Sequence, residues 1–142
     1  MKRIIFAFLL ISSAEAIDHG DFVFHSIGAW NQDLEVFQGR AEMAYSLWND
    51  FSIGPVMEFN KFYYAPALGV TWHLEPFELL AHAGPLFWRD KGEKRTSFQI
   101  SVHANYLLQV TTHWQLLFTA GANLPEKYFR GVPIGAGIRY WF

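Results

Sequence analysis

Alternation of apolar and polar residues with a period of two runs through most of this chain, and it restricts the possible folds more than any other feature. Its clearest occurrence is a stretch in which apolar residues interleave with amide, hydroxyl and imidazole residues: Phe98, Gln99, Ile100, Ser101, Val102 and His103. Successive side chains of a β-strand point to opposite faces, so this pattern predicts strands with one apolar and one polar face. Segments of this kind, most of them about ten residues long, are residues 21–30, 34–48, 51–60, 68–74, 77–88, 97–110, 114–121 and 132–142.

These segments predict an all-β fold: an eight-stranded antiparallel transmembrane up-and-down β-barrel, with its apolar faces toward lipid and its polar faces toward the lumen. The chain has no cysteine, so hydrogen bonding and packing must hold the fold, and a closed barrel achieves this without a free edge. Aromatic residues make up 18% of the chain, and the mean hydropathy of +0.08 is too low for a bundle of transmembrane helices. A soluble up-and-down barrel with its apolar faces inside is the alternative that alternation alone leaves open.

The amino-terminal segment differs from the rest of the chain and predicts a cleaved signal peptide. Lys2 and Arg3 precede an apolar run over residues 4–11, and Ala14 and Ala16 form a small-x-small cleavage site. The run is too short to span a bilayer as a helix, which takes about 20 residues. The sequence therefore predicts a signal peptide over residues 1–16 and one exported barrel domain over residues 17–142.

The lengths of the connections predict which end of the barrel faces which side of the membrane. An even number of strands places both ends of the barrel on the periplasmic side, with short turns there and longer loops outside. The short turns lie around Asn49, Glu75 and Thr112, and the longer loops cover residues 61–66, 89–95 and 123–131. Aromatic residues gather near both sets of strand ends, as membrane interfaces select.

The third and the first strands depart from the simple pattern. Pro55 predicts a break in the third strand, because proline cannot donate a hydrogen bond to the ladder. The facing of the first strand stays open, since Phe22 and Trp30 compete with Val23 and Ile27 for the apolar face.

The polar faces of the strands predict a lumen rich in ionisable residues. Those residues are Arg40, Glu42, Glu58, His73, Glu78, His82, His103 and Arg139. An eight-stranded barrel is just wide enough for side chains to fill, so they should form a packed polar core rather than a channel wall. If Leu47 pairs with Phe51, Arg40 lies opposite Glu58 and the two should form an ion pair.

The fifth and sixth strands bring histidines together in the predicted lumen. Pairing Phe87 with Phe98 sets His82 opposite His103, and a slip of two residues would instead bring His82 opposite Ser101. Two imidazoles without a third ligand at a defined spacing do not predict a metal site. We therefore expect a hydrogen-bonded histidine core with no metal and no cofactor.

The end of the chain carries a resemblance to a known family. Ile138, Tyr140 and Phe142 form the apolar face of a strand that ends on an aromatic residue. In this the sequence resembles the bacterial outer-membrane β-barrel proteins, of the OmpA/OmpX-type build, whose last strand typically ends in Phe. The resemblance implies a monomer in the outer membrane, in contact with outer-membrane lipid and lipopolysaccharide. It also implies that these three residues form an insertion signal for the barrel-assembly machinery.

Size and topology also look like the lipid A deacylase barrels, whose catalytic pattern is His-x-Ser-Asn near the end of the seventh strand. The corresponding residues 118–125 contain neither His nor Ser, so no catalytic residue is carried over. Ser101 and His103 lie about 6.6 Å apart along one strand, beyond hydrogen-bond reach. The net charge of -2 gives no basic footprint for nucleic acid. We expect a non-enzymatic structural or surface-interaction protein acting through its outer loops, with a lipid A-modifying enzyme and a narrow pore as alternatives.

Overall fold

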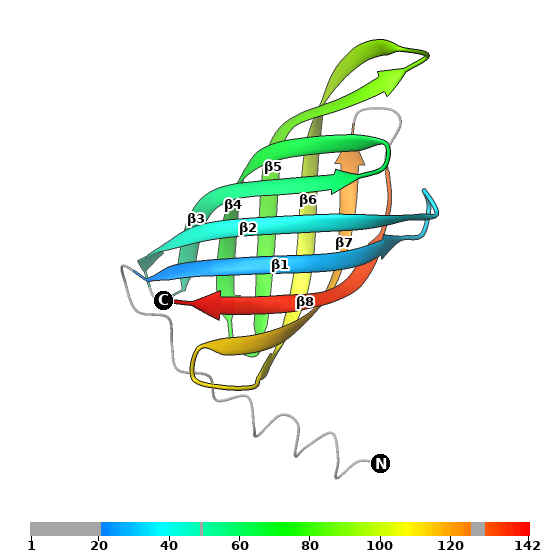
Figure 1. Cartoon of the computed structure of the whole chain (residues 1–142). Helices are drawn as coiled ribbons and strands as arrows, with labels where there is room; N and C mark the ends of the chain where they lie inside the picture. The colour runs from blue at the N-terminus through cyan, green and yellow to red at the C-terminus, as the bar shows by residue number, and fades with distance from the viewer. Residues whose placement is uncertain (1–20, 49, 126–129) are drawn as a thin grey trace.

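The computed structural model describes residues 21–48, 50–125 and 130–142, which form one closed barrel. Neighbouring strands in the chain pair with one another, and β1 pairs with β8 to close the barrel (Figure 1). The strands are β1 (Phe22–Asn31), β2 (Val36–Trp48), β3 (Phe51–Asn60), β4 (Tyr63–Leu74), β5 (Phe77–Asp90), β6 (Glu93–Gln109), β7 (Trp114–Pro125) and β8 (Pro133–Trp141). All eight strand pairs are antiparallel, which confirms the predicted architecture. In this part of the chain there is no helix long and apolar enough to cross a membrane.

The barrel is polar inside and apolar outside. On β6, Gln99, Ser101 and His103 are buried in the lumen, whereas Phe98 and Ile100 are 53% and 48% exposed on the outer wall. A soluble barrel has the opposite arrangement, because its apolar residues fill the interior. The soluble alternative therefore does not fit the described residues, and the facing is that of a barrel solvated by lipid.

Pairing decides the facing of β1. Val23 and His25 face the lumen, and Phe22 faces outward. Val23 lies opposite Ala44 of β2 and Trp141 of β8, and both of these residues are buried. Opposite residues in a sheet share a face, so the two neighbouring strands fix what the composition of β1 leaves open.

The hairpin of β5 and β6 extends beyond the other connections of the barrel (Figure 1). Residues 89–95, expected to form a loop, instead continue both strands around a turn at Lys91 and Gly92. These two residues have φ of 48° and 87°, as a two-residue type I′ hairpin turn requires. The loop prediction was wrong because charged side chains are tolerated in paired strands that stand in water.

Two other strands are also longer than predicted, whereas β2 and β8 are slightly shorter. β4 begins at Tyr63, inside the loop expected over residues 61–66, and β7 continues to Pro125. The predicted signal peptide and the centre of the last loop, residues 126–129, lie outside the described residues.

Pro55 interrupts one ladder but not the strand. β3 is continuous, and Pro55 pairs with Leu68 of β4, whereas the ladder between β2 and β3 gives Pro55 no partner among the described residues. The predicted break is therefore confined to the β2 side. Elsewhere in that ladder Arg40 lies opposite Glu58, as the predicted register requires.

The two ends of the barrel carry different connections (Figure 1). At the terminus end, β1 begins and β8 ends side by side, and the backbone N–H of Phe142 donates to the carbonyl of Phe22 at 3.0 Å. The β2–β3, β4–β5 and β6–β7 turns share this end, because consecutive strands alternate in direction. The loop end carries the β1–β2, β3–β4, β5–β6 and β7–β8 connections.

Candidate functional site

The lumen holds every ionisable residue that the sequence places on the inner face. Each is at most 6% exposed: Arg40, Glu42, Glu58, His73, Glu78, His82, His103 and Arg139. Burying a charge is costly unless it is paired and hydrogen-bonded, so the partners of these groups determine what the lumen can do.

One group of contacts centres on Glu78, near the terminus end. Arg139 Nη2 lies 3.0 Å from Glu78 Oε1, and His73 Nδ1 lies 2.8 Å from the same oxygen. Arg139 also donates to the side-chain oxygen of Gln115, and His73 Nε2 lies 3.0 Å from Ser52 Oγ. Glu78 is therefore paired with a guanidinium and hydrogen-bonded in the dry interior.

His25 connects this group to Glu42, and sequence reasoning missed it. His25 Nδ1 lies 2.8 Å from Glu42 Oε2 and Nε2 lies 3.5 Å from Glu78 Oε2. Thr71 Oγ1 donates to the second oxygen of Glu42 at 2.8 Å. The signal was present in the register, because His25 lies opposite both Glu42 and Arg139. It could not be used while the facing of β1 was open.

Arg40 does not form the predicted ion pair. It lies opposite Glu58 in the register, but its Nη2 donates to Asn105 Oδ1 of β6 at 3.3 Å. Within the described residues no nitrogen of Arg40 comes within 4.0 Å of a Glu58 oxygen. In so narrow a bore a long side chain can reach a strand across the lumen, so the register between neighbours does not decide its partner.

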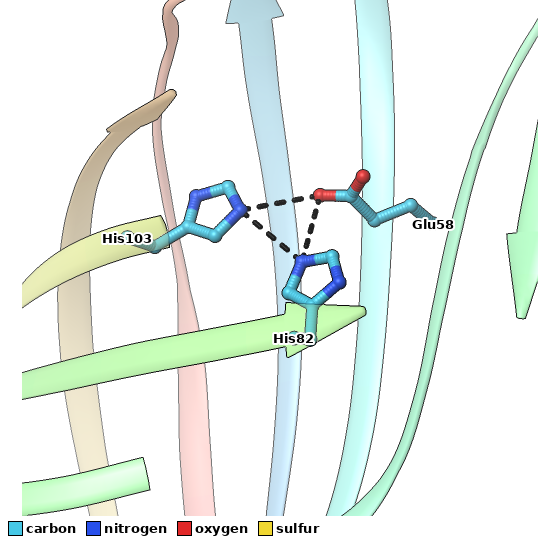
Figure 2. Close-up of side chains that lie close together, drawn as sticks. All are labelled: Glu58, His82 and His103. Carbon is cyan, nitrogen blue, oxygen red and sulfur yellow. Dashed lines mark hydrogen bonds and ion pairs between the residues drawn. The ribbon is translucent and has the colours of Figure 1, made fainter. Parts of the chain in front are cut away.

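Glu58, His82 and His103 form a compact cluster, which we call the Glu58 cluster (Figure 2). His82 Nε2 lies 3.4 Å and His103 Nε2 lies 3.3 Å from Glu58 Oε1. The two Nε2 atoms are 3.3 Å apart. The residues come from β5, β6 and β3, three strands of the barrel wall. The structure thus supplies the third polar side chain that the sequence pattern did not reveal.

The register between β5 and β6 differs from the predicted one by two residues. His82 lies opposite Ser101, not His103, because the two-residue turn at Lys91 and Gly92 sets the pairing of the whole hairpin. His82 and His103 still meet, since diagonal neighbours on one face of a sheet are within reach of large side chains.

This register creates a possible dyad of Ser101 and His82, but the geometry does not favour nucleophilic catalysis. Ser101 Oγ accepts a hydrogen bond from Gln99 Nε2 at 2.8 Å. Ser101 is 0% exposed, and its oxygen lies inside the lumen. A nucleophile must reach the substrate as well as its base, and a lipid cannot enter this interior.

A second site lies at the loop end, on the surface. A groove of about 820 Å³ separates the β3–β4 turn from the β5–β6 hairpin. We call it the rim groove and define it by Lys61, Tyr64, Phe87, Arg89, Lys94 and Arg95. Among the described residues, its lining includes four that are basic, six that are aromatic and none that is acidic.

The contacts within the rim groove leave its charges accessible. The rings of Tyr64 and Phe87 stack with centroids 5.1 Å apart, and form an aromatic wall. Lys61 Nζ lies 4.8 Å from the ring centre of Phe62. Arg95 pairs with Glu93 at 2.7 Å, but its side chain is half exposed. Sequence reasoning placed the basic residues and Tyr64 in outer loops and Phe87 near the end of the fifth strand. It did not bring them together, because the hairpin was taken for a loop.

Comparisons with known proteins bear on the fold alone. No protein-family model and no curated protein sequence matches the chain. Among solved structures, the N-terminal β-barrel domain of Pseudomonas aeruginosa OprF matches at 10% identity and a TM-score of 0.70, over 89% of this chain and 100% of that one. Yersinia pestis Ail in a phospholipid nanodisc matches at 11% identity and a TM-score of 0.56, over 87% and 100%.

A second Ail structure, at 12% identity and a TM-score of 0.52, is a complex with the heparin analogue sucrose octasulfate, and covers 87% of this chain and 99% of that one. These structures share the closed-barrel fold with this chain at low sequence identity. The chain thus has the fold of the small bacterial outer-membrane β-barrel proteins.

Proposed function

We propose that the protein is a monomeric integral outer-membrane barrel that binds phosphorylated or sulfated saccharide in the rim groove. The observation that carries this proposal is the rim groove itself, which combines four cations with an aromatic wall at the loop end of a lipid-facing barrel. The nearest source of such groups is the lipopolysaccharide of the surrounding outer leaflet. Export by the predicted signal peptide and insertion through the terminal aromatic strand are part of the same proposal.

The outer wall supports a membrane location. Large aromatic side chains are exposed near both ends of the strands, and apolar side chains lie between them. The exposed aromatics are Trp48, Phe51, Trp72, Phe77 and Trp114 near the terminus end, and Trp30, Phe37, Phe59, Tyr64 and Phe98 near the loop end. Two such girdles are typical of barrels whose strand ends meet the two membrane interfaces.

The chemistry of the rim groove supports an anionic saccharide ligand. Guanidinium groups bind phosphate and sulfate through two parallel hydrogen bonds, and Arg89 and Arg95 offer such forks. Lys61 and Lys94 add point charges on either side of the groove. The Ail structure with sucrose octasulfate gives a precedent for an anionic saccharide on a barrel of this fold.

The interior supports a binding role over the two alternatives. A pore needs a continuous water path, whereas the lumen is filled by paired side chains such as Glu78 with Arg139. An enzyme of the deacylase type needs an accessible nucleophile, and Ser101 is sealed inside. We expect no steady conductance in planar bilayers and unchanged lipid A acylation on expression. Steady conductance would favour the pore, and acyl loss would favour the enzyme.

Titration of the folded protein in detergent micelles with sucrose octasulfate, and separately with lipopolysaccharide, tests the proposal. Lys94→Gln and Arg89→Gln should each weaken binding about fivefold. Each removes one cation, which contributes about 1 kcal/mol near an anionic surface. Lys91→Gln is the matched control, because Lys91 is a basic residue of the same hairpin that does not line the groove.

The two titrations distinguish the possible sources of the ligand, and the controls test whether the groove is the binding site. Binding of both ligands indicates a general site for anionic saccharide, and binding of lipopolysaccharide alone assigns the site to the membrane lipid. Affinity should fall as salt rises, since exposed charges are screened. Equal losses in Lys91→Gln and Lys94→Gln, or binding that does not depend on salt, would contradict a built groove.

A further inference from the structure

Three donor atoms of the Glu58 cluster converge on one point of the lumen (Figure 2). Glu58 Oε1, His82 Nε2 and His103 Nε2 are separated by 3.3 Å, 3.4 Å and 3.3 Å, so they form a nearly equilateral triangle. Each of the three residues is at least 97% buried, and each is fixed on a different strand.

These separations match the spacing of ligands around a tetrahedral metal ion. Bonds of about 2.0–2.1 Å at tetrahedral angles place neighbouring ligand atoms about 3.3–3.4 Å apart. An ion at that distance from all three atoms would lie about 0.7 Å from their plane, by the same geometry. We propose that Glu58, His82 and His103 bind one divalent transition-metal ion inside the barrel, and the set of two imidazoles and one carboxylate suits Zn²⁺.

The guanidinium groups of the described lumen do not pair with the Glu58 cluster. The buried carboxylates of the described lumen are Glu42, Glu58 and Glu78, against the two guanidinium groups of Arg40 and Arg139. Glu78 pairs with Arg139, whereas Glu58 has no guanidinium within 4.0 Å among the described residues. A divalent ion would supply the positive charge that Glu58 lacks.

The hydrogen bonds around Glu58 point the same way. Gln99 Nε2 donates to Glu58 Oε2, but within the described structure Glu58 Oε1 accepts no well-directed hydrogen bond despite being fully buried. A single proton shared between the two histidines would serve one edge of the triangle and leave Oε1 outside. An ion would satisfy all three atoms, and a bound ion is one recognised explanation for a buried unsatisfied oxygen.

Space for a fourth ligand adjoins the cluster. A cavity of about 10 Å³ is lined by Glu58, His103 and Arg40, among others. This is close to the room that one water molecule needs. A water there could complete the tetrahedron, but the sealed lumen keeps substrate away, so the ion would tie three strands together and take no part in a reaction.

The sealed position determines how the test is run. Because the ligands are buried, the ion should enter while the barrel folds, and it should resist removal afterwards. The protein is unfolded with chelator, refolded into detergent micelles with or without Zn²⁺, desalted through EDTA, and analysed for bound metal by mass spectrometry. We expect about one Zn²⁺ per chain after refolding with zinc, and a higher melting temperature than after refolding with EDTA.

Variants locate the ion. Glu58→Gln, His82→Gln and His103→Gln should each lower zinc affinity by at least the roughly 10–100-fold that even outer-shell changes cause. His73→Gln is the control, because His73 is also a buried lumen histidine bound to a carboxylate, outside the cluster. It should keep its zinc, and far-UV circular dichroism establishes which variants are folded before metal is compared.

A measurement on the unaltered protein keeps the test decisive if a variant fails to fold. X-ray absorption at the zinc edge should show two imidazole nitrogens and oxygen ligands at about 2.0–2.1 Å. Failure to retain zinc after refolding, equal zinc in Glu58→Gln and the unaltered protein, or a spectrum without imidazole would overturn the site. None of these results bears on the rim groove, which lies at the other surface of the wall.

Discussion

At the scale of single residues, the burial of charged groups in the lumen depends on pairs such as Glu78 with Arg139. Glu78 and Arg139 are the closest carboxylate–guanidinium pair inside the described barrel, at 3.0 Å and about 1% exposure or less. Removing one member of such a pair leaves an uncompensated charge in a dry interior, which is worse than removing both.

Glu78→Gln or Arg139→Met should therefore each lower the stability by about 3–5 kcal/mol, and the double variant should recover part of the loss. Chemical unfolding in micelles, followed by tryptophan emission, measures the midpoints. Arg95→Met is the control, because its pair with Glu93 is exposed and worth about 1 kcal/mol or less. Additive losses in the double variant would show that the two side chains do not interact.

Outside β1, alternation predicted which polar residues enter the lumen, but not which of them touch. Facing follows from local geometry, whereas contact depends on side chains that cross the bore, as Arg40 does to reach Asn105. Predicting the Glu58 cluster would have required the register of the β5–β6 hairpin. A shift of two residues in that register changes the residue opposite His82 from His103 to Ser101. His25 was missed because its facing depends on two neighbouring strands, not on its own segment.

At the scale of strands and turns, the β5–β6 hairpin builds one wall of the rim groove, and its turn depends on Gly92. This residue has φ of 87°, and a Cβ placed on it would meet nothing within 4 Å. Gly92→Ala should therefore destabilise the hairpin through the backbone alone, by about 1–2 kcal/mol. Hydrogen exchange should quicken at the tip of β5 and β6 while the barrel amides stay protected.

Lys91→Asn provides the contrast within the same turn. Lys91 also has positive φ, and asparagine adopts this conformation more readily than lysine. Exchange at the hairpin tip should be unchanged or slower in this variant. If hydrogen exchange at the hairpin tip became faster in Lys91→Asn but did not change in Gly92→Ala, the turn would not be of the type I′ form.

The last strand ends on the residue proposed as part of the insertion signal. Phe142 is exposed beyond β8, its ring meets that of Tyr140 edge to face at 4.8 Å, and its backbone N–H bonds to Phe22. Deletion of Phe142 should lower the fraction of protein in the outer membrane, although little lipid-facing area is lost. Phe98→Ala removes a similar aromatic from the wall and should insert normally. If the deletion variant and the intact chain inserted equally, Phe142 would not be required for assembly.

Strand existence was predictable because alternation persists wherever one face meets lipid and the other the lumen. The ends of the strands were not predictable, because the difference between a lipid-facing and a lumen-facing side disappears above the membrane. Both faces of the hairpin tip meet water, so residues 89–95 lose the pattern while keeping the hydrogen bonds.

At the scale of the whole molecule, the closed antiparallel order puts both ends of the barrel chain and three short turns on one side. The chain has no cysteine, so single introduced cysteines report topology directly. Lys91→Cys should react with a membrane-impermeant maleimide on intact cells. Asp50→Cys and Thr112→Cys should react only after the outer membrane is permeabilised. Labelling of Asp50→Cys on intact cells would reverse the proposed orientation.

The length of one hairpin limits what the protein can meet. β6 has 17 residues, about seven more than a crossing requires, so at about 3.3 Å per residue its tip stands no more than about 23 Å above the hydrocarbon boundary. The groove runs down one side of that hairpin, from Arg89 and Lys94 to Phe87, and its deeper part favours partners that arrive sideways within the leaflet or as thin, flexible chains. A bulky globular partner approaching from the medium would meet the tip at Lys91 and Gly92 long before it reached Tyr64 and Phe87.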